Sequence, residues 1–85
     1  MDKYIVITFE SVNFAMQTES VLKGKDIRHQ IIPTPREITL SCGLSIKMAY
    51  DNLKDIREMI DSSTIRIKKL YVFQGIGTGK TIQEI

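Results

Sequence analysis

Residues 38–48, ITLSCGLSIKM, alternate without interruption between apolar side chains and small or polar ones. One face of this run carries six side chains: Ile38, Leu40, Cys42, Leu44, Ile46 and Met48. Such strict alternation is typical of a half-buried β-strand. A straight strand over the whole run would measure about 37 Å, whereas a compact chain of this length is only about 31 Å across. The run must therefore bend, and Gly43, which lacks a Cβ atom, is best suited to absorb the bend.

Three other segments have the character of strands. Residues 3–8 contain the short run YIVIT, rich in β-branched side chains, which predicts a buried first strand. Residues 27–32 form the second, which ends at Pro33 because Pro33 and Pro35 cannot donate a ladder hydrogen bond. The bent run supplies a third strand over residues 43–49, and residues 66–73 supply the last.

Two segments have the periodicity of amphipathic helices, residues 11–23 and 51–61. Ser11 and Asp51 are expected to cap their N-termini, and Gly24 to end the first helix in a left-handed conformation. Apolar side chains then form one stripe on each helix. The stripe of the first helix contains Val12, Ala15, Met16 and Leu22, and that of the second contains Leu53, Ile56, Met59 and Ile60.

The resulting order, β-α-β-β-α-β, predicts an α+β fold of the ferredoxin-like split β-α-β type. Such a domain has a four-stranded antiparallel sheet with both helices on one face. Residues 1–74 are expected to form this single domain, and residues 75–85 a Gly-rich C-terminal tail. The tail sequence GTGKT resembles a phosphate-binding loop, but Gln74 occupies the position of the required first glycine. Nucleotide binding there is therefore not expected.

The composition excludes several classes of protein. The chain has 85 residues with a formal net charge of +2, which argues against nucleic acid as a partner. A small basic cluster, Arg66, Lys68 and Lys69, fits a solvated strand face. With one cysteine and one histidine, neither an internal disulfide nor a structural metal site is expected, and the single thiol suggests a cytoplasmic setting. The sequence indicates no cofactor, and no run approaches the roughly 20 apolar residues of a membrane span.

Residues 33–43, PTPREITLSCG, combine both prolines of the chain with its only cysteine. A thiol becomes nucleophilic as a thiolate, and nearby positive charge or free N–H groups lower its pKa from about 8.5. Arg36 lies on the same segment as Cys42, and Ser41 and Gly43 flank the sulfur with small side chains. Gly43 also permits a second molecule to approach closely. The residues alone leave a second interpretation open: Cys42 is in phase with apolar neighbours, as expected of an inert core cysteine.

One acidic residue lies on the apolar stripe of the first helix. Glu19 is adjacent to Val12 on the helical wheel, and a buried carboxylate without a partner is costly. It either reaches water at the edge of the stripe or pairs with Arg36 or Lys47 near the cysteine segment, as possible support for the site. His29 has the chemistry of a proton shuttle by residue type alone.

The cysteine segment resembles the signature of the selenium/sulfur carrier-like protein family, approximately P-x-P-R-E-I-x-x-S-C-G. The matching positions are Pro33, Pro35, Arg36, Glu37, Ile38, Ser41, Cys42 and Gly43. The resemblance implies that Cys42 carries sulfur or selenium as a persulfide or perselenide, in a carrier rather than a turnover enzyme. Its implied partners are a cysteine desulfurase or another sulfur or selenium donor, and an acceptor protein.

A different class of function competes with this one. Ferredoxin-like domains host many unrelated activities, and their sheet edges pair readily with copies or partners. The chain could equally be a non-catalytic binding or assembly module, as a monomer or homodimer, with Cys42 as a buried structural residue. The reactivity of the thiol in the folded protein distinguishes the two.

Overall fold

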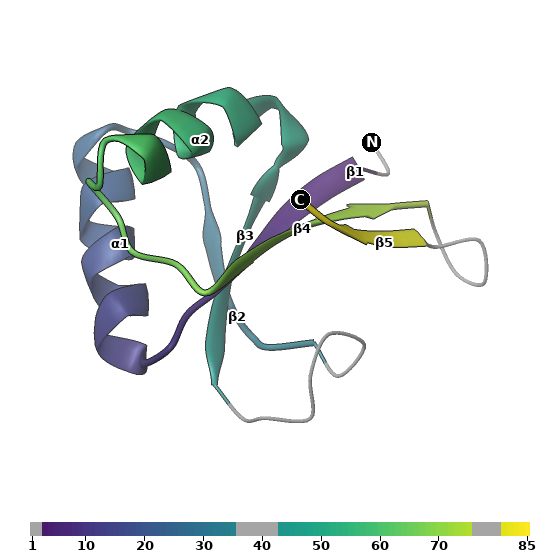
Figure 1. Ribbon diagram of the computed structural model, residues 1–85, viewed down its shortest axis with the longest axis horizontal. Coiled ribbons are helices and arrows are strands. Elements are labelled where there is room, and N and C mark those ends of the chain that lie inside the picture. The colour runs from purple at the N-terminus through teal and green to yellow at the C-terminus, as the bar shows by residue number, and fades with distance from the viewer. Residues whose placement is uncertain (1–2, 36–42, 76–80) are drawn as a thin grey trace.

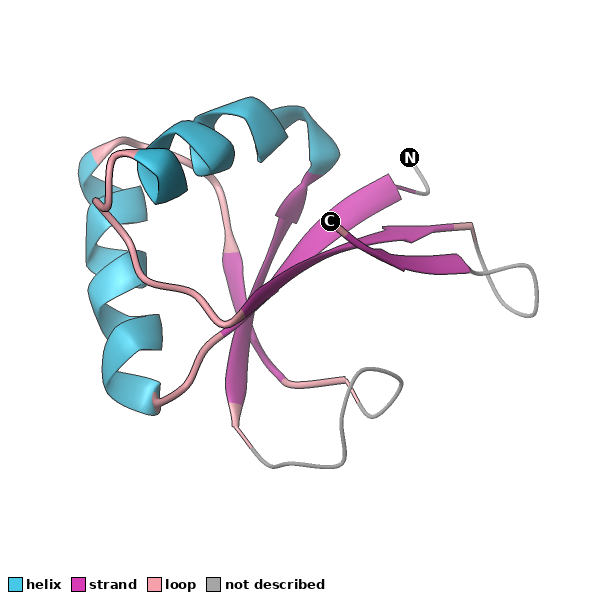
Figure 2. Cartoon of the chain, viewed as in Figure 1, coloured by secondary structure: helices cyan, strands magenta, loops and turns pink. Residues whose placement is uncertain are grey.

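The computed structural model describes residues 3–35, 43–75 and 81–85, which form helices packed against a single sheet (Figures 1 and 2). The elements in chain order are β1 (Lys3–Thr8), α1 (Val12–Gly24), β2 (Gln30–Pro33), β3 (Leu44–Ala49), a 3-10 turn η1 (Tyr50–Asn52), α2 (Leu53–Asp61), β4 (Lys69–Gln74) and β5 (Thr81–Glu84). Every pairing between these strands is antiparallel, and their order in the sheet is β2-β3-β1-β4-β5. The predicted α+β class, with two helices on an antiparallel sheet, is confirmed for the described part of the chain.

The core lies between the helices and one face of the sheet. Ile7 of β1 pairs with Ile46 on one side and Leu70 on the other, so three apolar side chains cross the sheet in a row. Leu22 of α1 and Ile56 of α2 are fully buried in the same cluster. Figure 1 shows both helices on the same side of the sheet.

The sheet has five strands, so the expectation of four was wrong. The additional strand, β5, comes from the segment expected to be a tail and pairs with β4, with Ile82 opposite Phe73. Its four residues include one half-buried side chain, and its pairing partner is supplied by the preceding strand. A strand this short and polar has too little alternation of apolar and polar residues to be predicted from sequence without its pairing partner.

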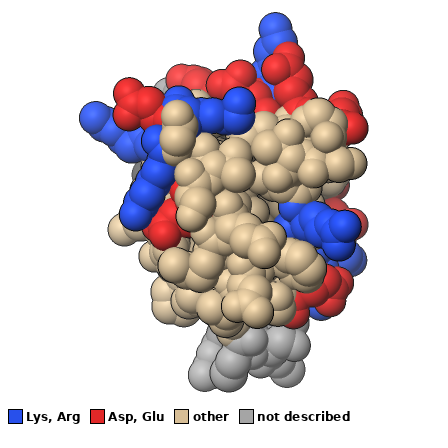
Figure 3. Space-filling model, turned by 90° about the vertical axis from the view of Figure 1, so that its left-hand side faces the viewer, with Lys and Arg blue, Asp and Glu red and all other residues tan. Residues whose placement is uncertain are grey.

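Helix α1 begins as expected but presents a different stripe to the core. The Ser11 hydroxyl accepts a hydrogen bond from the Phe14 amide at 3.4 Å, which confirms the cap. The buried residues of α1 are Ala15, Thr18 and Leu22. The predicted stripe also included Val12 and Met16, which are 51% and 44% exposed. Figure 3, which views the side of the molecule where α1 lies, shows a broad area of uncharged side chains bordered by charged ones.

The ends of both helices differ in detail from the predictions. Gly24 is the last residue of α1, and the left-handed conformation falls instead on Asp26, at φ 59°. The Ile27 amide closes the helix end by donating to the Leu22 carbonyl, so β2 cannot begin as early as expected. Asp51 lies within the 3-10 turn rather than capping α2, which starts at Leu53.

Candidate functional site

The segment with the cysteine connects β2 to β3, which are antiparallel neighbours. The last pair of this ladder is Pro33 with Leu44. Beyond it, the Thr34 amide donates to the Gly43 carbonyl at 3.0 Å, and the Thr34 and Ser45 hydroxyls lie 2.7 Å apart. The two ends of the β2–β3 connection, residues 34–43, are therefore held together by backbone and side-chain hydrogen bonds.

The structure describes some of the predicted site residues and not others. Pro33 ends β2 and is exposed, Pro35 is half-buried and Gly43 is exposed. Arg36, Ser41 and Cys42 lie outside the described residues. The expected bend at Cys42 and the exposure of its sulfur therefore stay predictions.

The backbone conformation at position 43 does not require a glycine. The φ of Gly43 is not in the left-handed region, and among the described residues a Cβ atom added there would meet only the Thr34 hydroxyl, at an ordinary 3.7 Å. An alanine would fit without displacement of these neighbours. The described part of the fold therefore supplies no steric reason for glycine at a position next to the cysteine.

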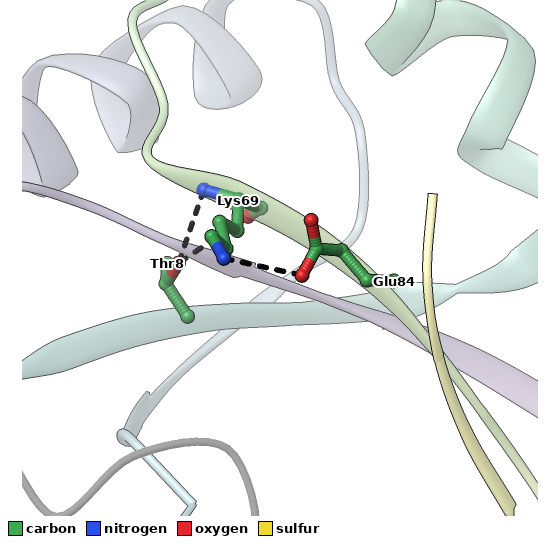
Figure 4. A network of polar contacts seen from close by, with 3 residues as sticks. All are labelled: Thr8, Lys69 and Glu84. Atoms are coloured by element: carbon green, nitrogen blue, oxygen red, sulfur yellow. Dashed lines mark hydrogen bonds and ion pairs between the residues drawn. The ribbon is translucent and has the colours of Figure 1, made fainter.

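The basic residues at the start of β4 lie at the same end of the sheet as this connection. Thr8, the last residue of β1, pairs with Ser45 on one side and Lys69 on the other. Its hydroxyl accepts from the Lys69 amide at 3.1 Å (Figure 4). Its carbonyl accepts from the Lys68 amide at 2.7 Å. At the usual spacing of strands, the Lys69 backbone is on the order of 10 Å from that of Ser45. This proximity has no signal in the local sequence, because it depends on the pairing of strands far apart in the chain.

Lys69 is itself paired. Its ammonium donates to the Glu84 carboxylate at 3.2 Å (Figure 4). The hydrogen bond to Glu84, and then the attraction of the same carboxylate, raise the pKa of Lys69 above its ordinary value of 10.5. Both side chains are about half exposed, so solvent screens this pair and it adds little to stability.

Glu19 has partners that the sequence analysis did not foresee. Its carboxylate lies 3.5 Å from Nε2 of His29 and 3.9 Å from the Lys23 ammonium. His29 also places Nδ1 2.9 Å from the Ile27 carbonyl. The suggested pairing with Lys47 does not form, because the Lys47 ammonium lies over the Tyr4 ring, 4.4 Å from its centroid. These contacts tie α1 to the segment before β2, and a supporting role near Cys42 stays a prediction for Glu19.

His29 immediately precedes β2, whereas the cysteine segment leaves the opposite end of that strand. No observed contact links the imidazole to the described ends of the β2–β3 connection. In the part of the chain that the structure describes, no group of three or more His, Cys, Asp or Glu residues could hold a metal ion. Neither described helix is long and apolar enough to cross a membrane.

Comparison with known proteins identifies a family. No curated protein and no solved structure matches the chain. The family described as "Putative Se/S carrier protein-like" matches residues 3–72, which include the whole of the PTPREITLSCG segment. Because this match spans most of the 85 residues, the chain belongs to the Se/S carrier protein-like family.

Proposed function

We propose that this protein carries sulfur or selenium on Cys42, as a persulfide or perselenide. The observation that carries the proposal is the closed base of the β2–β3 connection, where Thr34 bonds to both Gly43 and Ser45. This base fixes the residue next to the single cysteine of a chain that belongs to a carrier-like family. A fixed backbone is what a relay needs, because the sulfur must be presented to two different partners in turn.

The proposed transfer is an exchange of sulfane sulfur. The Cys42 thiolate attacks the outer sulfur of a donor protein's persulfide, such as that of a cysteine desulfurase. A new S–S bond forms at Cys42, the S–S bond of the donor breaks, and the donor leaves as a thiolate. The thiolate of an acceptor protein then repeats the step on Cys42, so neither step needs an added oxidant or reductant. A perselenide would pass on selenium in the same way.

The neighbours of Cys42 have distinct parts in this proposal. Arg36 and the N–H groups around Ser41 and Gly43 favour the thiolate, and Pro33 and Pro35 restrict the approach of the chain to the site. The positive charge of Lys68 adds to this effect at longer range. Among the described residues, Lys68 has no carboxylate partner within 4 Å. Its contribution is modest, because an exposed charge that acts at long range is largely screened at physiological salt.

The absence of a side chain at Gly43 also supports the proposal. Because the backbone would accept a Cβ atom there, we propose that the glycine serves the close approach of a donor or acceptor thiol. Gly43→Ala should then retain the stability of the parent while sulfur transfer slows. Equal transfer rates for the variant and the parent would remove this role.

We propose further that β1 to β4 and both helices form a ferredoxin-like unit within residues 1–74, with β5 added at one edge. The support is the element order and the strand order β2-β3-β1-β4 within the sheet. We place the carrier in the cytoplasm, where thiols stay reduced and a single reactive cysteine remains available.

The rate of Cys42 alkylation in the folded protein, measured against pH, tests the reactivity that a carrier needs. The proposal predicts a thiol pKa below the free value of about 8.5, and a higher pKa in Arg36→Ala. Arg57→Ala removes the same charge from α2 and should leave the profile unchanged. A thiol that reacts only after denaturant is added would refute the carrier and favour the binding module with a buried cysteine.

A further inference from the structure

A polar cleft of about 360 Å³ lies on the helical side of the molecule. One wall is formed by the first two turns of α1, and the other by the segment that joins α2 to β4. The polar side chains that line it are Gln17, Thr18, Ser63, Thr64 and Arg66. The proposed transfer chemistry involves none of these residues.

Several of these polar groups lack a partner among the residues that the structure describes. Thr18 is only 1% exposed, and its hydroxyl has no hydrogen-bond partner in that part of the chain. Buried polar groups are nearly always paired, so an unpaired one at a cleft calls for an explanation. The Gln17 and Ser63 side chains likewise have no hydrogen bond to any residue that the structure describes, whereas Thr64 is bonded to Ser62 at 2.8 Å.

Arg66 gives the cleft its charge. Its guanidinium carbon lies 6.0 Å from the centroid of the Phe14 ring, which also lines the cleft and supports the planar group through a cation–π contact. Among residues 3–35, 43–75 and 81–85, no carboxylate approaches Arg66 within 4 Å and no acidic residue lines the cleft. The site therefore combines an unpaired guanidinium with amide and hydroxyl donors.

We propose that this cleft binds a small oxyanion, a carboxylate or phosphate group, with Arg66 as its charged anchor. A guanidinium matches two oxygens of either group with parallel N–H donors. The Gln17 amide and the Ser63 hydroxyl provide further donors at the margin of the cleft. Rotation of the Thr18 side chain would offer its unpaired hydroxyl to the same ligand.

Amide chemical shifts of the full chain, followed by NMR, test the proposal. Sodium acetate, sodium phosphate and sodium chloride are titrated at constant ionic strength, with binding read from Phe14, Thr18, Ser63 and Arg66. We expect saturable shifts with acetate, phosphate or both, and the two arms show which oxyanion the cleft prefers. Responses to both anions that do not saturate, or that chloride reproduces, would overturn the proposal.

Two substitutions make the test specific. Arg66→Gln should weaken oxyanion binding by about tenfold or more, as expected for a charged hydrogen bond. Lys68→Gln removes the same charge two residues away, outside the cleft lining, and should leave the affinity within about twofold, as expected for a screened surface charge. Gln17→Leu should also weaken binding while the spectrum stays that of the folded protein. Equal losses in Arg66→Gln and Lys68→Gln would show only general attraction to a positive surface and would contradict the assignment.

Discussion

The hydroxyls of Thr34 and Ser45 lie 2.7 Å apart and close the base of the connection that carries the only cysteine. Ser45 is fully buried, so neither water nor another described side chain replaces this bond. The same residue pairs with Thr8 at the end of the central strand. The base of the connection is thus anchored to the most buried strand of the sheet.

Ser45→Ala should destabilise the fold by about 1–3 kcal/mol, because it removes a buried hydrogen bond and leaves the Thr34 hydroxyl without this partner. The free energy of unfolding in urea gives the measurement. Thr34→Val combined with Ser45→Ala should cost less than the sum of the two single changes. Ser20→Ala, on the exposed side of α1, provides a control expected to stay within about 0.5 kcal/mol. Strict additivity of the pair would contradict the coupling.

Leu22→Ala and Ile56→Ala should each destabilise by about 2–5 kcal/mol, because both side chains are fully buried in the core. Met16→Ala is the matched control on α1 and should cost less than about 1 kcal/mol, since this side chain is 44% exposed. Chemical denaturation measures all three. A loss for Met16→Ala as large as that for Leu22→Ala would mean that Met16 is packed in the core, as the stripe expected from sequence has it.

The difference in burial between Leu22 and Met16 shows what the local sequence can and cannot determine. Alternation located β3, a run of β-branched residues located β1, and the Ser11 cap located the start of α1, because these signals depend on nearby residues. The rotation of α1 could not be predicted, since Val12 and Met16 are as apolar as core residues and only packing against the sheet shows that they are exposed. β5 was missed for a related reason: its strand character depends on pairing with β4.

Thr18→Val should stabilise the protein by about 1 kcal/mol or more. The substitution keeps the shape of the side chain and removes a buried hydroxyl that has no partner. Thermal or urea unfolding without added anions measures the change. A clear loss of stability would show that the hydroxyl is satisfied in the folded protein.

Glu84→Gln should lower the pKa of Lys69 toward its ordinary value of 10.5. Glu84 favours the charged ammonium in the folded chain, so its stabilising effect is complete below pH 10.5 and is lost as the pH rises through the higher folded-state pKa. An NMR titration of the Lys69 side chain follows this change. Glu58→Gln, on α2, removes a carboxylate elsewhere and should leave the titration unaltered, whereas unchanged behaviour in Glu84→Gln would contradict the pairing.

For the candidate site, the motif could be predicted from sequence, but the contacts that surround it could not. The motif around Cys42 can be identified from sequence because its residues are contiguous. The bonds from Thr34 to Gly43 and Ser45 depend on the register of β2 with β3. The approach of Lys68 and Lys69 to the same end depends on β1 lying between β3 and β4. Long-range pairings of this kind have no local signal in the chain.

Intact-mass spectrometry of the protein after incubation with a cysteine desulfurase and cysteine tests the central claim most directly. The account predicts a species heavier by one sulfur atom, with the added atom located on Cys42 by peptide mapping and removed by a reducing thiol. Cys42→Ser should gain no sulfur while it keeps the unfolding transition of the parent. A folded parent chain that gains no sulfur from donors that load other thiols, or one that gains it equally in Cys42→Ser, would contradict the proposed carrier.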